Sequence, residues 1–245
     1  MISQLRTYSE GWFAVLLLLQ ASPALAGSVT GSVRLIDSHD ASVRKNNDFF
    51  GVVIWLERTD GAAIPLQPKT AQMAQKKKTI VPHVLAVPVG STVSFPNLDP
   101  IFHNVFSNFA GQVFDVGLYP PGKDQRVRFS RPGIIRVFCN IHPTMFGVIV
   151  VLNTPYMAVS NSNGAFHIDG VEAGEYRLHV FHERAAEETL KALERNLRVG
   201  DDTVSLQPLE ISETGYIPQP HKNKFGKDYP AIIEDRPMYP AGRNR

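Results

Sequence analysis

The sequence contains a single cysteine, Cys139, among its 245 residues. One cysteine cannot form a disulfide within the chain, so the fold must be stabilised by burial of apolar side chains instead. A free thiol in an oxidising compartment is a chemical liability unless burial or a metal ion protects it. The environment of this one residue is therefore informative about the function of the protein.

Long apolar runs and a strong excess of one charge are also missing. The chain has 25 basic and 23 acidic residues and a net charge of +2, which excludes a strong electrostatic field for nucleic acid or a membrane. The apolar run at residues 12–19 is too short for a membrane span of about 20 residues. It follows Arg6 and precedes Ala24-Leu25-Ala26, so residues 1–26 are predicted to be a cleaved secretory signal. We expect export to a periplasm, with no membrane insertion after cleavage.

Common catalytic motifs are absent as well. The sequence has no Gly-x-Ser-x-Gly, His-Glu-x-x-His or glycine-rich phosphate loop, and each of these places a nucleophile, a metal or a phosphate in a defined geometry. The sequence therefore predicts a protein that is not an enzyme.

Turn residues and short β-branched runs dominate what is present. Glycine and proline number 18 each, and short strands bounded by such residues indicate a β-sandwich. Residues 38–48 and 64–79 are expected to be loops, and Lys76-Lys77-Lys78 at the end of the second is interpreted as solvated, with docking of an acidic partner as the alternative. The expected strands are residues 28–35, 50–57, 84–89, 92–95, 134–138 and 146–152.

Three possible metal ligands, Cys139, His142 and Met145, lie between two of these expected strands. They occupy the loop of a hairpin, and loops held by a rigid sheet are common sites of chemistry. His103 adds a second imidazole upstream. Singly, a buried Cys, a His-Pro turn and a core Met are each ordinary structural features. Together, two His, one Cys and one Met match a trigonal copper site with a weak axial thioether, the electron-transfer type.

These residues resemble a known family. His103-Asn104 followed by Cys-x-x-His-x-x-Met resembles the blue copper proteins, or cupredoxins, of the amicyanin and plastocyanin type, over residues 27–153. The longer chain resembles those labelled methylamine utilisation proteins. The resemblance implies an all-β fold, a cupredoxin-like Greek-key β-sandwich with one type 1 copper ion. It also implies that Asn104 ties the two ligand loops together. The implied metal ligands are His103, Cys139, His142 and Met145.

A second unit is expected after Thr154-Pro155. Asn-Gly-x-Phe at residues 163–166 and Gly-x-Tyr-x-Leu at residues 174–178 resemble a carboxypeptidase regulatory-like, transthyretin-like β-sandwich, which we assign to residues 154–211. Such a likeness indicates a fold and not a function. Helical spacing of leucines predicts a helix over residues 185–196, and residues 203–211 are predicted to form a last strand. Residues 212–245 are an extended tail that wraps the body or docks a partner.

The sequence thus predicts an exported electron carrier that cycles one copper ion between Cu(I) and Cu(II). The resemblance implies that His142 faces solvent in an apolar patch with Pro143 and Phe146, and the expected partner is a redox protein of the dehydrogenase or cytochrome type. A periplasmic copper chaperone or store is the main alternative, although the five methionines are not clustered. A binding module with a structural copper is the third hypothesis. His83 is interpreted as structural or exposed, with a role at the metal as the alternative.

Overall fold

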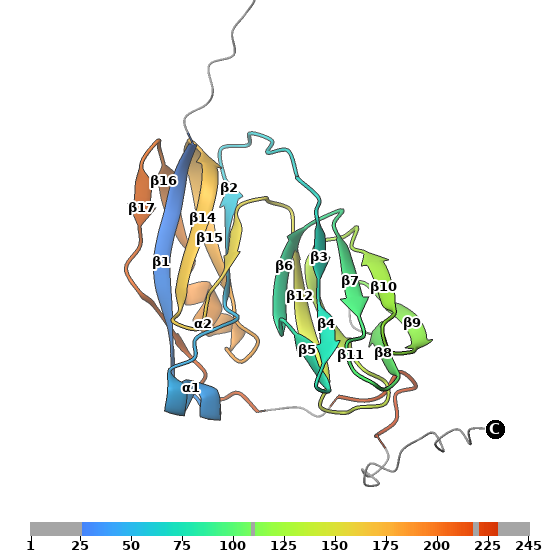
Figure 1. Ribbon diagram of the computed structural model, residues 1–245. Helices are drawn as coiled ribbons and strands as arrows, with labels where there is room; N and C mark the ends of the chain where they lie inside the picture. Colours follow the sequence, from blue (N-terminus) through green and yellow to red (C-terminus); the bar gives the residue numbers. More distant parts are fainter. Residues whose placement is uncertain (1–25, 109–110, 218–220, 230–245) are drawn as a thin grey trace, which may run out of the picture.

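The computed structural model describes residues 26–108, 111–217 and 221–229. Its regular elements are almost all strands (Figure 1), so the predicted all-β sandwich fold is confirmed. Apart from Ala26, the predicted secretory signal lies outside the described residues. Across the described ranges, no helix has the length and apolar character needed to span a bilayer.

The strands form two sandwiches, and one is inserted into the other. The insert sandwich is continuous in sequence, from Thr70 to Leu152. Its first sheet has the order β10 (Asp124–Arg128), β7 (Thr92–Pro96), β3 (Thr70–Gln72). Its second has the order β6 (Val84–Pro88), β12 (Phe146–Leu152), β11 (Gly133–Phe138), β8 (His103–Ser107), β9 (Phe114–Tyr119). A small hairpin joins β4 (Ala74–Lys76) to β5 (Thr79–Val81).

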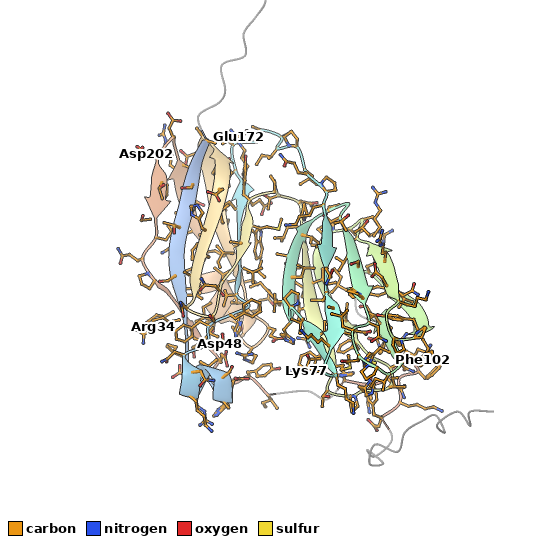
Figure 2. The ribbon with its side chains drawn as sticks, in the orientation of Figure 1. Arg34, Asp48, Lys77, Phe102, Glu172 and Asp202 are labelled. Atoms are coloured by element: carbon orange, nitrogen blue, oxygen red, sulfur yellow. The ribbon has the colours of Figure 1, made fainter. Side chains whose placement is uncertain are left out.

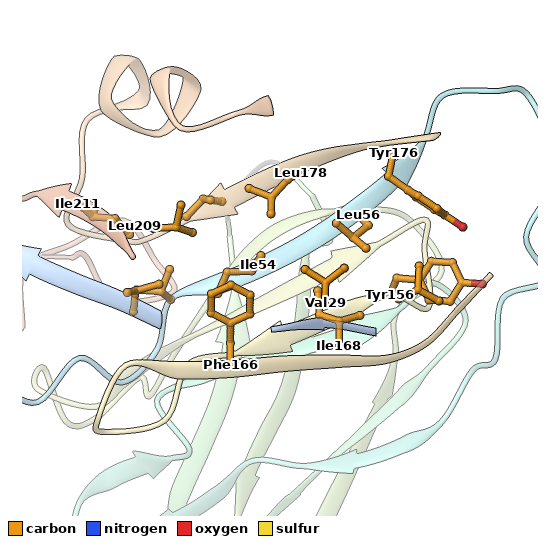
Figure 3. Close-up of a cluster of buried hydrophobic side chains, with 14 of the residues drawn as sticks. Val29, Ile54, Leu56, Tyr156, Phe166, Ile168, Tyr176, Leu178, Leu209 and Ile211 are labelled. Carbon is orange, nitrogen blue, oxygen red and sulfur yellow. The ribbon is translucent and has the colours of Figure 1, made fainter. Parts of the chain in front are cut away.

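The host sandwich is built from segments on both sides of the insert in the sequence. One sheet has β1 (Ala26–Ile36) at its centre, with β14 (Ala165–Glu172), β17 (Thr203–Ser205) and β18 (Leu209–Ser212) as neighbours. The other has the order β13 (Met157–Val159), β2 (Val53–Arg58), β15 (Gly174–Phe181), β16 (Arg195–Val199). Buried apolar side chains from both sheets fill the space between them (Figure 3).

This arrangement corrects the predicted domain boundaries of residues 27–153 and 154–211. Strand β1 pairs with β14 at Val29 opposite Ile168, and strand β2 pairs with β15 at Leu56 opposite Leu178. The first two strands therefore belong to the host sandwich, and only the later part of residues 27–153 forms the insert. The physical reason is that β1 buries alternate apolar residues in the host core. Alternation identifies a strand but not the sheet that the strand joins.

Smaller elements also differ from the expected ones. The loop at residues 38–48 contains helix α1 (Ala41–Asn46), whose first turn is capped by the Asp40 carboxylate accepting from the Ser42 N–H at 2.7 Å. The helix expected over residues 185–196 is limited to α2 (Glu187–Ala192), because the chain then pairs with β15 as β16. The last predicted strand is divided into β17 and β18, on either side of residues 206–208.

The two sandwiches lie side by side (Figure 1), and buried side chains from both are in contact. A third buried cluster joins Val53 of the host to Val84, Val148 and Val150 of the insert. A polar contact lies at the same boundary, where His83 Nε2 is 2.7 Å from Glu183 Oε1. His83 is therefore part of the contact between sandwiches.

Candidate metal centre

The loop at residues 139–145 lies at one end of the insert sandwich, near Lys77 and Phe102 in Figure 2. Strands β11 and β12 pair as far as Phe138 opposite Phe146, so the loop begins and ends on a closed ladder. Two backbone hydrogen bonds tighten it, from Cys139 N–H to the Met145 carbonyl at 3.0 Å and from Met145 N–H to the His142 carbonyl at 3.1 Å. His103 starts β8, which also pairs with β11. Folding thus brings His103 beside the loop.

Three of the four predicted ligands converge. His103 Nδ1 lies 3.8 Å from Cys139 Sγ, and His142 Nδ1 lies 3.5 Å from the same sulfur. The three donor atoms are within 4.8 Å of one another. Donors about 2.0–2.3 Å from an ion, in a trigonal plane, are separated by roughly 3.5–4 Å. The observed spacing therefore fits one ion shared by three ligands.

Met145, the fourth predicted ligand, lies at the end of the same loop, directly before β12. Its side chain is fully buried and belongs to the same apolar cluster as Cys139. Its carbonyl accepts the hydrogen bond from Cys139 N–H. The thioether thus lies in the core that also buries the thiol, and the axial role of Met145 remains a prediction.

Burial governs the protonation of both buried ligands. It raises the pKa of the Cys139 thiol, and backbone N–H groups of Ile141, Asn104 and His142 oppose this by stabilising the thiolate. Burial also lowers the pKa of His103, although Asp99 acts in the opposite direction. His103 is therefore neutral and keeps a lone pair for a metal. A bound cation replaces the thiol proton and supplies the charge that makes a buried thiolate stable.

Asp99 belongs to the candidate site, and the sequence did not reveal it. Its carboxylate lies 2.9 Å from His103 Nε2 and also accepts the backbone N–H groups of Lys77 and Lys78, at 2.5 and 2.8 Å. Burial raises the pKa of Asp99, but these donors outweigh it, and the pKa lies below its usual value. The ionised carboxylate accepts the Nε2–H of His103 and so directs Nδ1 toward Cys139. Such carboxylate–histidine pairs commonly fix the orientation of metal ligands.

Asn104 connects the two ligand segments through its backbone. Its N–H is one of the donors to Cys139, whereas its side-chain amide donates to Asp115 Oδ1 at 2.7 Å and to the Gly117 carbonyl at 2.9 Å. The side chain therefore fastens β8 to β9. The expectation that Asn104 ties the loops together holds for its main chain.

Other predicted candidates lie outside this centre. His83 contacts Glu183 and the Phe146 carbonyl. Among the described residues, one group of three side chains could bind a metal ion, and His83 does not belong to it. Lys77 and Lys78 shape the turn that holds Asp99, since both have left-handed backbone conformations with φ of 54° and 55°. Residues 221–229 of the predicted tail contact the metal loop.

Comparison with known proteins finds solved structures that are similar to part of this chain. No family model and no curated protein matches the sequence. A purple cupredoxin from Nitrosopumilus maritimus is 26% identical over 34% of this chain and 99% of its own, with a TM-score of 0.31. Amicyanin from Paracoccus versutus is 20% identical over 40% of this chain and 97% of its own, with a TM-score of 0.32. A copper-containing nitrite reductase from Thermus scotoductus is 28% identical over 40% of this chain and 26% of its own, with a TM-score of 0.34.

Proposed function

We propose that this chain is an exported type 1 copper protein that carries electrons. The observation that supports this most is the convergence of His103 Nδ1, Cys139 Sγ and His142 Nδ1 within 4.8 Å, at the edge of an apolar core that also contains Met145. Two imidazoles, a thiolate and a thioether form the donor set typical of electron-transfer copper. The residues present therefore fit one copper ion, which His103, Cys139, His142 and Met145 would hold.

Bound copper would supply a one-electron couple between Cu(I) and Cu(II). The protein supplies a site that needs little rearrangement, because the loop is anchored on a β-ladder and His103 is oriented by Asp99. Cys139 is fully buried, which keeps solvent away from the thiolate. His142 is only half-buried, so its ring is the ligand best placed for electrons to enter and leave.

The cellular role follows from the same reasoning. A half-exposed ligand beside fully buried ones suits electron exchange with another protein, and we assign the partner to the dehydrogenase or cytochrome class. The location is the periplasm, supported by the signal-like sequence of residues 1–26. The protein would be a carrier and not an enzyme.

The first test is the visible spectrum of the mature protein with one equivalent of Cu(II). We expect an intense thiolate-to-copper charge-transfer band. Cys139→Ser should abolish it, because a hydroxyl is a poor, uncharged donor to copper. A matched control is Ser107→Ala, which changes a buried hydroxyl on β8 and should keep the band. Equal colour in wild type and the Cys139 variant would refute the assignment.

The second test separates a carrier from a copper chaperone. Met145→Gln should retain copper and lower the reduction potential, because an amide oxygen favours Cu(II) over Cu(I) while the axial ligand contributes little to affinity. Voltammetry of both proteins measures this. A wild-type protein with no reversible couple that passes Cu(I) rapidly to a chelator would favour the chaperone instead.

A further inference from the structure

Residues 221–229, which we call the C-terminal strap, lie across the metal loop at the end of the insert sandwich (Figure 1). The strap has its own local structure. Asn223 Oδ1 accepts the N–H groups of Phe225 and Lys227 at 2.9 and 3.1 Å, and Asn223 N–H donates to the Lys227 carbonyl at 2.9 Å. It is therefore a compact turn with a defined face toward the loop.

Contacts from the strap are concentrated around Cys139. The Tyr229 hydroxyl donates to the Cys139 carbonyl at 2.7 Å, and Lys224 N–H donates to Asn140 Oδ1 at 2.9 Å. His221 Nε2 lies 2.7 Å from the Pro143 carbonyl. The strap thus contacts the thiolate-bearing residue, the residue after it, and the turn that follows His142.

Aromatic packing reinforces these hydrogen bonds. The His221 ring lies 4.3 Å from the ring of Phe138, the residue before Cys139, and 5.1 Å from the ring of Tyr229. The Tyr229 hydroxyl is also 3.2 Å from His221 Nδ1. Tyr229 and His221 therefore support each other while they hold the backbone on both sides of Cys139.

Hydrogen bonds inside the loop gather at its two ends and at the Cys139 thiol, which accepts from the N–H groups of Ile141 and His142. The two backbone hydrogen bonds described above hold residues 139–145, and both end on Met145. The Cys139 carbonyl points to the strap. Without the strap, rotation of the peptide after Cys139 would reorient the segment that leads to His142. A ligand loop that reorients between oxidation states slows electron transfer and loosens the metal.

We propose that Tyr229 and His221 are positioning residues that hold Cys139 and the loop in a metal-ready geometry before copper binds. The proposal rests on the proposed function for its copper readouts, whereas the ordering of the loop is measurable without any metal. The strap would be part of the site, although the second segment of the host sandwich separates it from Cys139 in the sequence.

The metal-free test is amide hydrogen exchange in Tyr229→Phe and in the double variant Tyr229→Phe/His221→Ala. Loss of one or two hydrogen bonds should speed exchange of the backbone amides of residues 139–142, 144 and 145 by about tenfold. Phe225→Leu is the matched control, since this strap residue is 70% exposed and its ring faces Lys224 Nζ of the strap itself, at 5.3 Å. Far-ultraviolet circular dichroism verifies the fold, and the single variant keeps the test valid if the double variant is unstable.

The copper test uses the same proteins. The double variant should show a shifted reduction potential and charge-transfer band, and should lose copper to a competing chelator about tenfold faster than wild type. Unchanged loop exchange, or faster exchange with an unchanged potential and band, would overturn the positioning role. A wild-type protein without any charge-transfer band would refute the proposed function, and loop exchange would then decide the ordering role alone.

Discussion

At the scale of single residues, the centre depends on how His103 is presented to the metal. An imidazole can rotate and can carry its proton on either nitrogen. Asp99 fixes both the orientation of the ring and the nitrogen that carries the proton, because its carboxylate accepts from Nε2 and is itself held by two backbone N–H groups. The second imidazole is placed differently, since His142 lies on the tight hairpin loop with Cys139. The two halves of the site are thus positioned by different means.

Asp99→Asn tests whether Asp99 positions His103 for the metal. The amide lacks the negative charge that stabilises the Nε2–H of His103, and it can no longer accept two backbone N–H groups as strongly. We expect copper affinity to fall by about 10–100-fold, measured by competition with a chelator. Asp124→Asn, which changes an exposed carboxylate on β10, should leave the affinity unchanged. Equal affinity in both variants would contradict the role assigned to Asp99.

These residues also show how far the sequence can define the site. Cys139 and His142 are predictable because they are three positions apart between two evident strands. His103 follows from the chemistry that those two require. Asp99 is not predictable in this way, because its role depends on the direction of its side chain and on the turn at Lys77 and Lys78. The strap is also unpredictable, since nothing local marks it as a neighbour of Cys139.

At the scale of elements, the position of a strand in the sequence is easier to predict than the strands with which it pairs. The run at residues 28–35 was recognised as a strand and is β1, but its neighbours β14, β17 and β18 are distant in sequence. Pairing of such strands is determined by packing in the host core and leaves no local signal. Turns are different, because their residues act locally. The turn at residues 161–164 was identified from its sequence and joins β13 to β14.

Gly164→Ala tests that turn. Gly164 has a φ of 80°, and an added Cβ would collide with the Val33 carbonyl on β1. The left-handed strain and the clash should together lower the free energy of unfolding by about 2 kcal/mol or more, measured with denaturant. Gly122→Ala is the matched control, with a φ of 73° and open space around its Cβ, and should cost only about 1 kcal/mol. Equal losses would show that the contact with β1 does not matter.

At the scale of the whole molecule, the insert sandwich contains every predicted copper ligand. Its core is separate from that of the host, and the two are joined by a third cluster at their boundary. The host is assembled from two segments that are separated by the insert. This organisation was not predicted, because each segment has an ordinary β pattern and only the pairing shows that they belong together.

Two fragments distinguish the observed organisation from the boundaries first expected. Residues 66–153 should fold and give a charge-transfer band, because β3 to β12 and the four ligands are all present, and the band should be shifted because the strap is missing. Residues 27–153 add β1 and β2 without their partners, and exposed apolar strands favour aggregation. Size-exclusion chromatography and the visible spectrum measure both outcomes. A soluble longer fragment together with an insoluble shorter one would contradict the insertion.

The insertion also sets an order of assembly in time. In a chain that emerges from its N-terminal end, β1 and β2 appear first but have no partners until β14, β15 and the strands after them follow. The insert has all its strands by Leu152, so it can fold while the host is still incomplete. The metal loop is then finished before residues 221–229 exist. His221 and Tyr229 therefore reach the loop last, and the metal-ready geometry that we propose they hold is completed only then.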